Sequence, residues 1–211
     1  RLLTTIAYRI NGKTTYAMEG SIFIAGAGVQ WLRDRMKFFK KATETEKIVK
    51  SLKDNNNIYL VPAFTGLGAP YWDANARGVL SGITRDTSPK EIVRATIEAV
   101  AYQTYDLFEA MKHDGLRPKI VKVDGGMVMN NWFSQFLSDV VSVSVLRPKV
   151  QETTALGAAL VAGLQIGIYK SLKDISKNWL LDKKFSPKMK KINRTNLVKK
   201  WSKAIERTLV T

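Results

Sequence analysis

The sequence contains no cysteine and a single histidine, His113. Without cysteine there can be no disulfide framework, no thiolate metal site and no cysteine nucleophile, and a cytoplasmic location is the expected one. A catalytic Ser/His/Asp arrangement would have to use His113, which lies near a polar helix end and is expected at the surface. Long apolar runs are also missing. No stretch approaches the roughly 18 consecutive apolar residues of a membrane-spanning helix, so we expect no membrane partner.

Acidic residues are few. The chain has 18 Asp and Glu against 34 Lys and Arg, which gives a formal net charge of +16. Residues 169–211 alone contain 13 of the basic residues and three of the acidic ones. A nucleic-acid partner is one interpretation of such an excess. Because the lysines are dispersed and no aromatic residues alternate with them, we favour a solvated, basic helical tail over 169–211 and do not expect nucleic acid to bind.

Hydrophobic residues make up 45% of the chain, enough for the core of one large domain or two small ones. An Asn-Gly dipeptide separates two β-rich runs, 2–10 and 13–18, and this is the strongest short signal for a β-hairpin. Helical spacing predicts helices over 21–39 and 43–53. The stretch 64–78 is a long connection rich in glycine, proline and aromatic residues, and such loops are usually functional or mobile.

The clearest helix begins after Ser88, where the sequence Ser-Pro-Lys-Glu predicts a capping box with proline at the first helical position. The helix is expected to end near His113. Beyond it, strands are expected over 119–123 and 141–146 and helices over 130–139 and 155–165, the last capped by Thr153 or Thr154. Strands that alternate with helices predict an α/β layer architecture. The N-terminal hairpin is expected to make its sheet mixed rather than purely parallel.

One glycine-containing segment, Asp124-Gly125-Gly126, lies between a predicted strand and a predicted helix. At such a junction glycine lets the backbone approach a ligand closely, and the helix N-terminus presents unpaired N–H groups. The arrangement suits a phosphate or adenosine group, although a purely structural tight turn has the same pattern. Asn130, at the start of the helix, either hydrogen-bonds a base or ribose or acts as an ordinary N-cap.

A second such segment has the sequence AGAG over 25–28, inside a predicted helix. Each glycine there costs about 1 kcal/mol relative to alanine, and close approach of a ligand or of a neighbouring helix would offset that cost. Gln30 lies one turn beyond Gly26 on roughly the same face. Glu98 and Asp124 are isolated carboxylates, so the residues alone indicate a nucleotide-binding domain without a visible catalytic group.

The run GVLSGITRDTSPKEIVRATIE over 78–98 resembles the second signature of the FGGY carbohydrate kinases. Two further segments resemble the glycerol kinases within that family, namely YAMEGSIFIAGAGVQWLRD over 16–34 and VPAFTGLGAPYWD over 61–73. The resemblance covers essentially the whole chain and is weakest in the basic tail. It implies that residues 1–211 form the C-terminal, nucleotide-binding domain of such a kinase, with an actin-like (ribonuclease H-like) fold.

The resemblance also implies a binding site. Kinases of this kind hold ATP, Mg²⁺ and glycerol between two domains, and the second domain contacts the adenine, ribose and phosphates. Matched by motif, the nucleotide-binding residues would be Gly26 and Gln30 in AGAGVQ and Gly126 and Asn130 in DGGMVMN. These four are positions that the glycine and capping arguments had indicated independently. The Mg²⁺ ion would be held mainly by the phosphates and by an N-terminal part of the kinase.

The family's catalytic Asp, its main glycerol-binding residues and a Gly-Thr-Gly phosphate-binding hairpin have no counterpart in this sequence. By the resemblance, the chain would start inside the second domain, short of its first strands, and would need an N-terminal half or a homo-oligomer as partner. Phosphoryl transfer depends on groups on both sides of the phosphates, so isolated activity would be negligible. The implied function is the nucleotide-binding half of a glycerol kinase. The alternatives are another FGGY sugar or polyol kinase and a non-catalytic remnant that acts as a binding domain.

Overall fold

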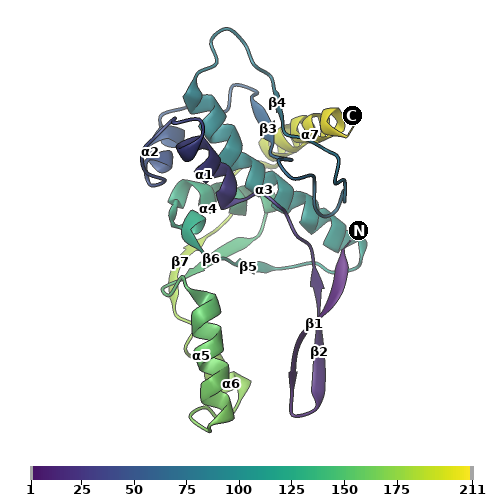
Figure 1. The fold of residues 1–211 in the computed structure, drawn as a ribbon, viewed down its shortest axis with the longest axis vertical. Coiled ribbons are helices and arrows are strands. Elements are labelled where there is room, and N and C mark those ends of the chain that lie inside the picture. The colour runs from purple at the N-terminus through teal and green to yellow at the C-terminus, as the bar shows by residue number, and fades with distance from the viewer. Residues whose placement is uncertain (1, 210–211) are drawn as a thin grey trace.

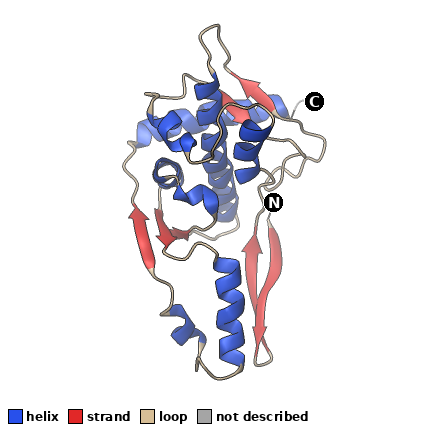
Figure 2. Cartoon of the chain, turned by 60° about the vertical axis from the view of Figure 1, so that its left-hand side comes forward, coloured by secondary structure: helices blue, strands red, loops and turns tan. Residues whose placement is uncertain are grey.

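The structure is a computed structural model that describes residues 2–209 (Figure 1). A body of helices and short strands carries two arms, which project from the same end of the molecule in Figures 1 and 2. The elements in chain order are β1 (Leu3–Ile10), β2 (Lys13–Glu19), α1 (Gly26–Asp34), α2 (Glu44–Lys50), β3 (Tyr59–Val61), β4 (Val79–Ser81), α3 (Pro89–His113), β5 (Ile120–Lys122), the 3₁₀ helix η1 (Gly126–Met129), α4 (Asn131–Val141), β6 (Ser144–Pro148), α5 (Thr153–Gln165), α6 (Leu172–Ser176), β7 (Leu181–Phe185) and α7 (Lys191–Thr208).

The strands form three small sheets. The hairpin β1–β2 and the pair β3–β4 are each antiparallel and two-stranded, and β5, β6 and β7 form a third sheet in that order. In this sheet β5 runs parallel to β6, whereas β7 runs antiparallel to it. The prediction of an α/β fold with a mixed sheet is confirmed. The expected reason was wrong, however, because β7 and not the N-terminal hairpin makes the sheet mixed.

Helix α3 forms the centre of the body and is buried along most of its length. Its predicted start is confirmed: the Ser88 side chain caps the helix, Pro89 occupies the first turn, and the Glu91 carboxylate accepts a hydrogen bond from the Ser88 N–H at 3.0 Å. Around Tyr102 the helix meets three other elements. The Tyr102 ring stacks on Trp201 of α7 at 5.3 Å, meets Phe136 of α4 edge-on at 5.6 Å, and lies 5.7 Å from Tyr59 of β3. Aromatic contacts therefore join α3, α4, α7 and β3 into one core.

The two arms are the hairpin β1–β2 and the helix pair α5–α6 (Figures 1 and 2). Every residue of β1 except the last is exposed, and α5, which is apolar on nearly all sides, has only Gly163 buried. Apolar side chains that lie exposed on the arms or just beside them include Leu3, Ile6, Tyr8, Tyr16, Val161, Ile166, Ile168 and Leu172. A two-stranded hairpin and a lone apolar helix gain little stability by themselves in water. Both arms thus present surface that is typical of an interface.

Two predicted helical segments differ from the structure. Helix α1 begins at Gly26, several residues later than expected, because Ala25 has a non-helical backbone (φ −118°, ψ −100°). The basic tail over 169–211 contains α6 and α7 as expected, but also the strand β7. Strand β7 has the sequence LDKKF, without alternation of apolar and polar residues, and only Phe185 is buried, so the sequence carries no strand signal there. Within residues 2–209, no helix combines the length and apolar character needed to cross a membrane.

The expected cap of α5 was also wrong. Neither Thr153 nor Thr154 is the N-cap, since that position belongs to Glu152, whose side chain makes no capping bond. The Thr153 hydroxyl instead donates a hydrogen bond to the Asp124 carboxylate at the end of β5. This contact ties the start of the α5 arm to the turn that precedes η1.

The connection over 64–78 is packed against the body. Leu67 and Ala69 are buried, and Leu67 exchanges backbone hydrogen bonds with Asp73 at 2.7 and 3.0 Å. The Tyr71 hydroxyl donates to Oδ2 of Asp106 on α3 at 2.9 Å, and Nε1 of Trp201 on α7 donates to the same oxygen at 2.8 Å. Asp106 therefore fastens this loop and the C-terminal helix to the central helix.

We expect Asp106 to make stability depend on pH. Burial raises its pKa from 3.8 to about 6, although the hydrogen bonds from Trp201 and Tyr71 favour the ionised form. The folded chain then binds more protons than the unfolded chain between about pH 4 and pH 6, so the free energy of unfolding falls as the pH rises through this range, by at most about 3 kcal/mol. Asp106→Asn keeps an acceptor for both donors but does not titrate. Urea unfolding of both proteins at several pH values should show this fall in the free energy of unfolding for the wild type alone. If the free energy of unfolding changed with pH in the same way in both proteins, Asp106 would not be its cause.

Candidate nucleotide-binding site

A cavity of about 350 Å³ lies between α1, α2 and the segment that contains η1. All four residues that the sequence indicated lie along its wall: Gly26, Gln30, Gly126 and Asn130. They come from two segments about a hundred residues apart in the sequence, and the fold brings both to one site. The remaining lining residues are Val29, Arg33, Ala42, Thr43, Thr45, Glu46, Ile97, Met127 and Met129.

The two glycines of α1 have different surroundings. A Cβ atom added to Gly26 would meet nothing within 4 Å, so the cavity reaches the backbone at the first residue of the helix. A Cβ atom added to Gly28 would lie 3.0 Å from Cγ2 of Thr96 on α3. Gly28 therefore allows two helices to pack closely, whereas Gly26 leaves room for a ligand beside N–H groups at the helix start.

The Asp-Gly-Gly segment forms a sharp turn at the end of β5. Gly125 has φ +82° and ψ 175°, a backbone conformation that residues with side chains rarely adopt, and η1 starts at the next residue. Gly126 has an ordinary φ, and a Cβ atom added there would meet nothing within 4 Å. The first glycine is thus needed for the turn, while the second exposes its backbone to the cavity.

Asn130 is the N-cap of α4, so its capping role is confirmed. Its side-chain oxygen accepts the Phe133 N–H at 3.0 Å, and its Nδ2 lies 3.4 Å from the Thr45 hydroxyl of α2. The long Nδ2 contact uses one of two amide hydrogens, which leaves the other as a donor to a group in the cavity. Capping and ligand contact are therefore compatible in this residue.

Four polar residues of the cavity wall were not indicated by the sequence: Arg33, Thr43, Thr45 and Glu46. Arg33 could have been found, because it lies one turn beyond Gln30 and two turns beyond Gly26 on the same helix face. Its guanidinium forms an ion pair with Asp34 at 2.7 Å and is partly exposed. Thr45 and Glu46 belong to α2, whose sequence gives no sign that it packs beside α4.

Glu46 positions the start of α4. Its carboxylate accepts the Asn131 N–H at 3.2 Å and pairs with Lys50 one turn along α2 at 2.5 Å. Partial burial alone would raise the pKa of Glu46, but the contacts with Lys50 and Asn131 lower it below its ordinary value. The wall of the cavity thus carries a carboxylate that stays ionised near neutral pH and holds α2 and α4 together.

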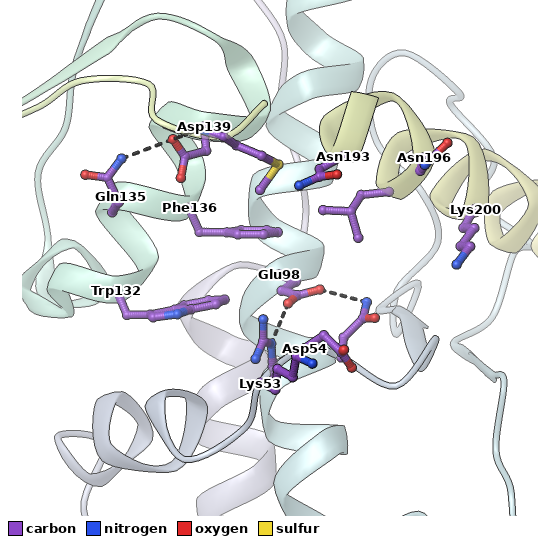
Figure 3. Close-up of a pocket in the computed structure, with 14 residues that line it drawn as sticks. Lys53, Asp54, Glu98, Trp132, Gln135, Phe136, Asp139, Asn193, Asn196 and Lys200 are labelled. Atoms are coloured by element: carbon purple, nitrogen blue, oxygen red, sulfur yellow. Dashed lines mark hydrogen bonds and ion pairs between the residues drawn. The ribbon is translucent and has the colours of Figure 1, made fainter. Parts of the chain in front are cut away.

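A second cavity, of about 480 Å³, is lined by residues of α3, α4 and α7 and of the segment after α2 (Figure 3). At its floor the fully buried Glu98 carboxylate pairs with Arg94 at 2.7 Å and accepts a hydrogen bond from Asn55 at 2.9 Å. Toward the rim, Asp139 accepts a hydrogen bond from Gln135 at 3.1 Å. Arg94 and Glu98 neutralise one another, and no glycine lies in the wall of this cavity to open the backbone to a ligand. The smaller cavity is therefore the better candidate for a nucleotide.

Comparisons of this sequence with a family model and with curated proteins agree with one another. The model of the FGGY family of carbohydrate kinases, C-terminal domain, matches residues 3–166. Glycerol kinase 1 of Pseudomonas aeruginosa is 55% identical over 207 residues, which cover 98% of this chain and 42% of that protein. A glycerol kinase of Clostridium botulinum is 52% identical, again with 42% of its length covered. The chain thus spans less than half the length of the curated relatives it matches.

Two solved kinase structures also superimpose on this chain. The Plasmodium falciparum glycerol kinase with ADP superimposes on the whole chain with a TM-score of 0.89 and 38% identity, and the chain covers 42% of it. A xylulose kinase of Lactobacillus acidophilus matches 94% of the chain with a TM-score of 0.76 at 24% identity, which supports the fold alone. The resemblance to glycerol kinases that the motifs indicated is confirmed. Since the family model matches most of the chain, the chain belongs to the FGGY family of carbohydrate kinases, within their C-terminal domain.

Proposed function

We propose that this chain is the nucleotide-binding half of a glycerol kinase, which transfers a phosphoryl group from ATP to glycerol. The observation that carries the proposal is the convergence of Gly26, Gln30, Gly126 and Asn130 on one cavity. Relatives more than half identical to the chain are glycerol kinases, and one solved glycerol kinase that superimposes on it contains ADP. The xylulose and gluconate kinases among the structural neighbours are at most 25% identical to the chain, so glycerol is favoured over other polyols and sugars.

The cavity suits an adenine nucleotide. The apolar side chains of Val29, Ile97, Met127 and Met129 line part of it and would contact a base or ribose. Gly26 and Gly126 expose backbone N–H groups beside helix starts, where a phosphate is stabilised by unpaired donors and the helix dipole. Gln30, which is exposed, and Asn130 add side-chain amides that could bind the ribose or base edge.

The part of the chain that the structure describes offers no ligand set for the Mg²⁺ ion of the proposed reaction. Among residues 2–209, no three His, Asp or Glu side chains lie close enough to hold a metal ion together. The ion would be bound by the phosphates and by the N-terminal part of the kinase, where it would offset the charge that develops in phosphoryl transfer. The contribution of this chain would be to bind and orient the nucleotide.

The remaining part of the kinase would supply the catalytic Asp and the glycerol-binding residues. We infer that it attaches at the two arms, because the hairpin β1–β2 and the helix α5 expose apolar side chains at the same end of the molecule. Ile166 and Ile168, at the end of α5 and just beyond it, are 74% and 67% exposed. A second copy of this chain is the alternative occupant. The reaction would take place in the cytoplasm, in agreement with a sequence that lacks cysteine.

A fusion experiment tests this proposal. The part of the Pseudomonas aeruginosa enzyme that precedes the matched region would be joined to this chain, and formation of glycerol 3-phosphate from ATP would be measured for the fusion and for each part alone. We expect turnover with glycerol, little with xylulose or gluconate, and none from either part alone. Turnover by this chain alone, or none by a folded fusion that binds ADP, would contradict the proposal.

A further inference from the structure

A third cavity, of about 450 Å³, lies between the end of α2, α4 and β7. Four exposed lysines line it: Lys50 from α2, Lys183 and Lys184 from β7, and Lys188 just beyond that strand. No carboxylate lines it. The other lining residues are Asn131, Trp132, Gln135, Phe185 and Ser186, and none of them lines the candidate nucleotide cavity.

Carboxylates on the elements around this cavity have other partners, except that Glu46 pairs with Lys50. Asp139 accepts the backbone N–H groups of Lys188 and Met189 at 2.5 and 3.1 Å. Asp182 pairs with the buried Arg147 at 2.7 Å, and Glu46 divides its carboxylate between Lys50 and the Asn131 N–H. Within the part of the chain that the structure describes, Lys50 is therefore paired, whereas Lys183, Lys184 and Lys188 form no ion pair.

The aromatic rings of the cavity are covered. Trp132 stacks on Phe136 at 4.9 Å with 10° between the planes, and the Arg94 guanidinium lies 5.0 Å from the Trp132 ring centroid. Phe185 is buried, with Lys183 and Arg147 over its ring at 5.2 and 5.5 Å. A ligand that binds by base stacking needs a free aromatic face, and these two rings do not provide one. The cavity offers charge and hydrogen-bond donors instead.

We propose that this lysine cavity binds a small, multiply charged anion made of linked phosphate groups, without a base. Lysine ammonium groups act as mobile point charges and donors toward phosphate oxygens. Three lysines without an ion-pair partner, with Lys50 beside them, match a ligand with several negative charges at short spacing. The site is separate from the candidate nucleotide cavity and does not depend on the kinase activity proposed above.

Inorganic tripolyphosphate is a suitable probe, titrated into the chain by calorimetry at low salt. The double variant Lys184→Gln/Lys188→Gln should bind it about tenfold more weakly, and higher salt should weaken wild-type binding, because both changes reduce attraction between charges. The matched control Lys13→Gln/Lys119→Gln removes the same net charge from exposed positions outside the cavity and should bind like the wild type.

Equal weakening in both double variants would show a general effect of net charge and would overturn the proposal. Absence of wild-type binding at millimolar tripolyphosphate would overturn it as well. Binding of a short single-stranded DNA of similar charge is measured in the same way. If it bound more tightly than tripolyphosphate and lost affinity in Lys184→Gln/Lys188→Gln, the cavity would be a nucleic-acid site instead.

Discussion

In a fusion with the N-terminal part of a glycerol kinase, Gly126→Val is expected to lower kcat/KM for ATP by about a hundredfold, or about 2.7 kcal/mol of transition-state stabilisation. The valine side chain would project into the candidate cavity, where a Cβ atom meets nothing within 4 Å. It would occupy the nucleotide's space and hold the phosphates away from the backbone N–H group. Steady-state kinetics with ATP and glycerol varied in turn measure the effect.

Two readouts separate this effect from damage to the fold. Because φ at Gly126 is not positive and the added atoms meet open space, the free energy of unfolding should stay within about 1 kcal/mol of the wild-type value. The KM for glycerol should also stay unchanged, since the proposed glycerol-binding residues belong to the other part. A variant that keeps full activity with ATP would show that the nucleotide does not occupy this cavity.

The second large effect is expected in the core: Glu98→Ala should lower the free energy of unfolding of the chain by about 3–5 kcal/mol. Glu98 is 1% exposed and pairs with Arg94, itself 8% exposed. The substitution would leave the Arg94 guanidinium buried without a counter-ion, and Asn55 and Tyr102 would each lose an acceptor. Urea unfolding followed by circular dichroism measures the loss.

A matched control is available on the same helix. Glu109 pairs with Lys112 at 3.3 Å, but the two side chains are 40% and 50% exposed, so Glu109→Ala should cost less than about 1 kcal/mol. The double variant Arg94→Leu/Glu98→Leu should lose less stability than the two single variants added together, because it leaves no unpaired buried charge. Equal losses for Glu98→Ala and Glu109→Ala would mean that burial of this pair contributes little.

Much of the fold could be predicted from local signals in the sequence. The capping box at Ser88 and the Asn-Gly turn act through bonds within a few residues, so they could be assigned from the sequence and both are present in the structure. The glycine pattern also indicated the site, because a glycine that weakens a helix needs a compensating contact. In the structure Gly28 lies within the helix, where close packing on Thr96 of α3 offsets its cost, whereas Gly26 is the first residue of α1 and leaves the backbone open to the cavity.

Features that depend on long-range contacts could not be predicted. Strand β7 has no apolar pattern and exists because it pairs with β6 and buries Phe185. The wall that α2 adds to the cavity depends on the contact of Glu46 with the Asn131 N–H, between residues 85 positions apart. The basic composition of the tail gave no hint that four lysines from α2, β7 and the segment after it would surround one cavity. Tertiary packing, and not local propensity, decides each of these.

The most direct test of the account is a crystal structure of the fusion protein, or of this chain if it proves stable, with bound ADP. We expect electron density for the nucleotide between α1 and η1, with its phosphates within hydrogen-bond distance of the backbone at Gly26 or Gly126 and with Gln30 and Asn130 beside its base or ribose. Clear density for ADP elsewhere, with this cavity empty or filled only by solvent, would contradict the assignment of these four residues as a nucleotide-binding site.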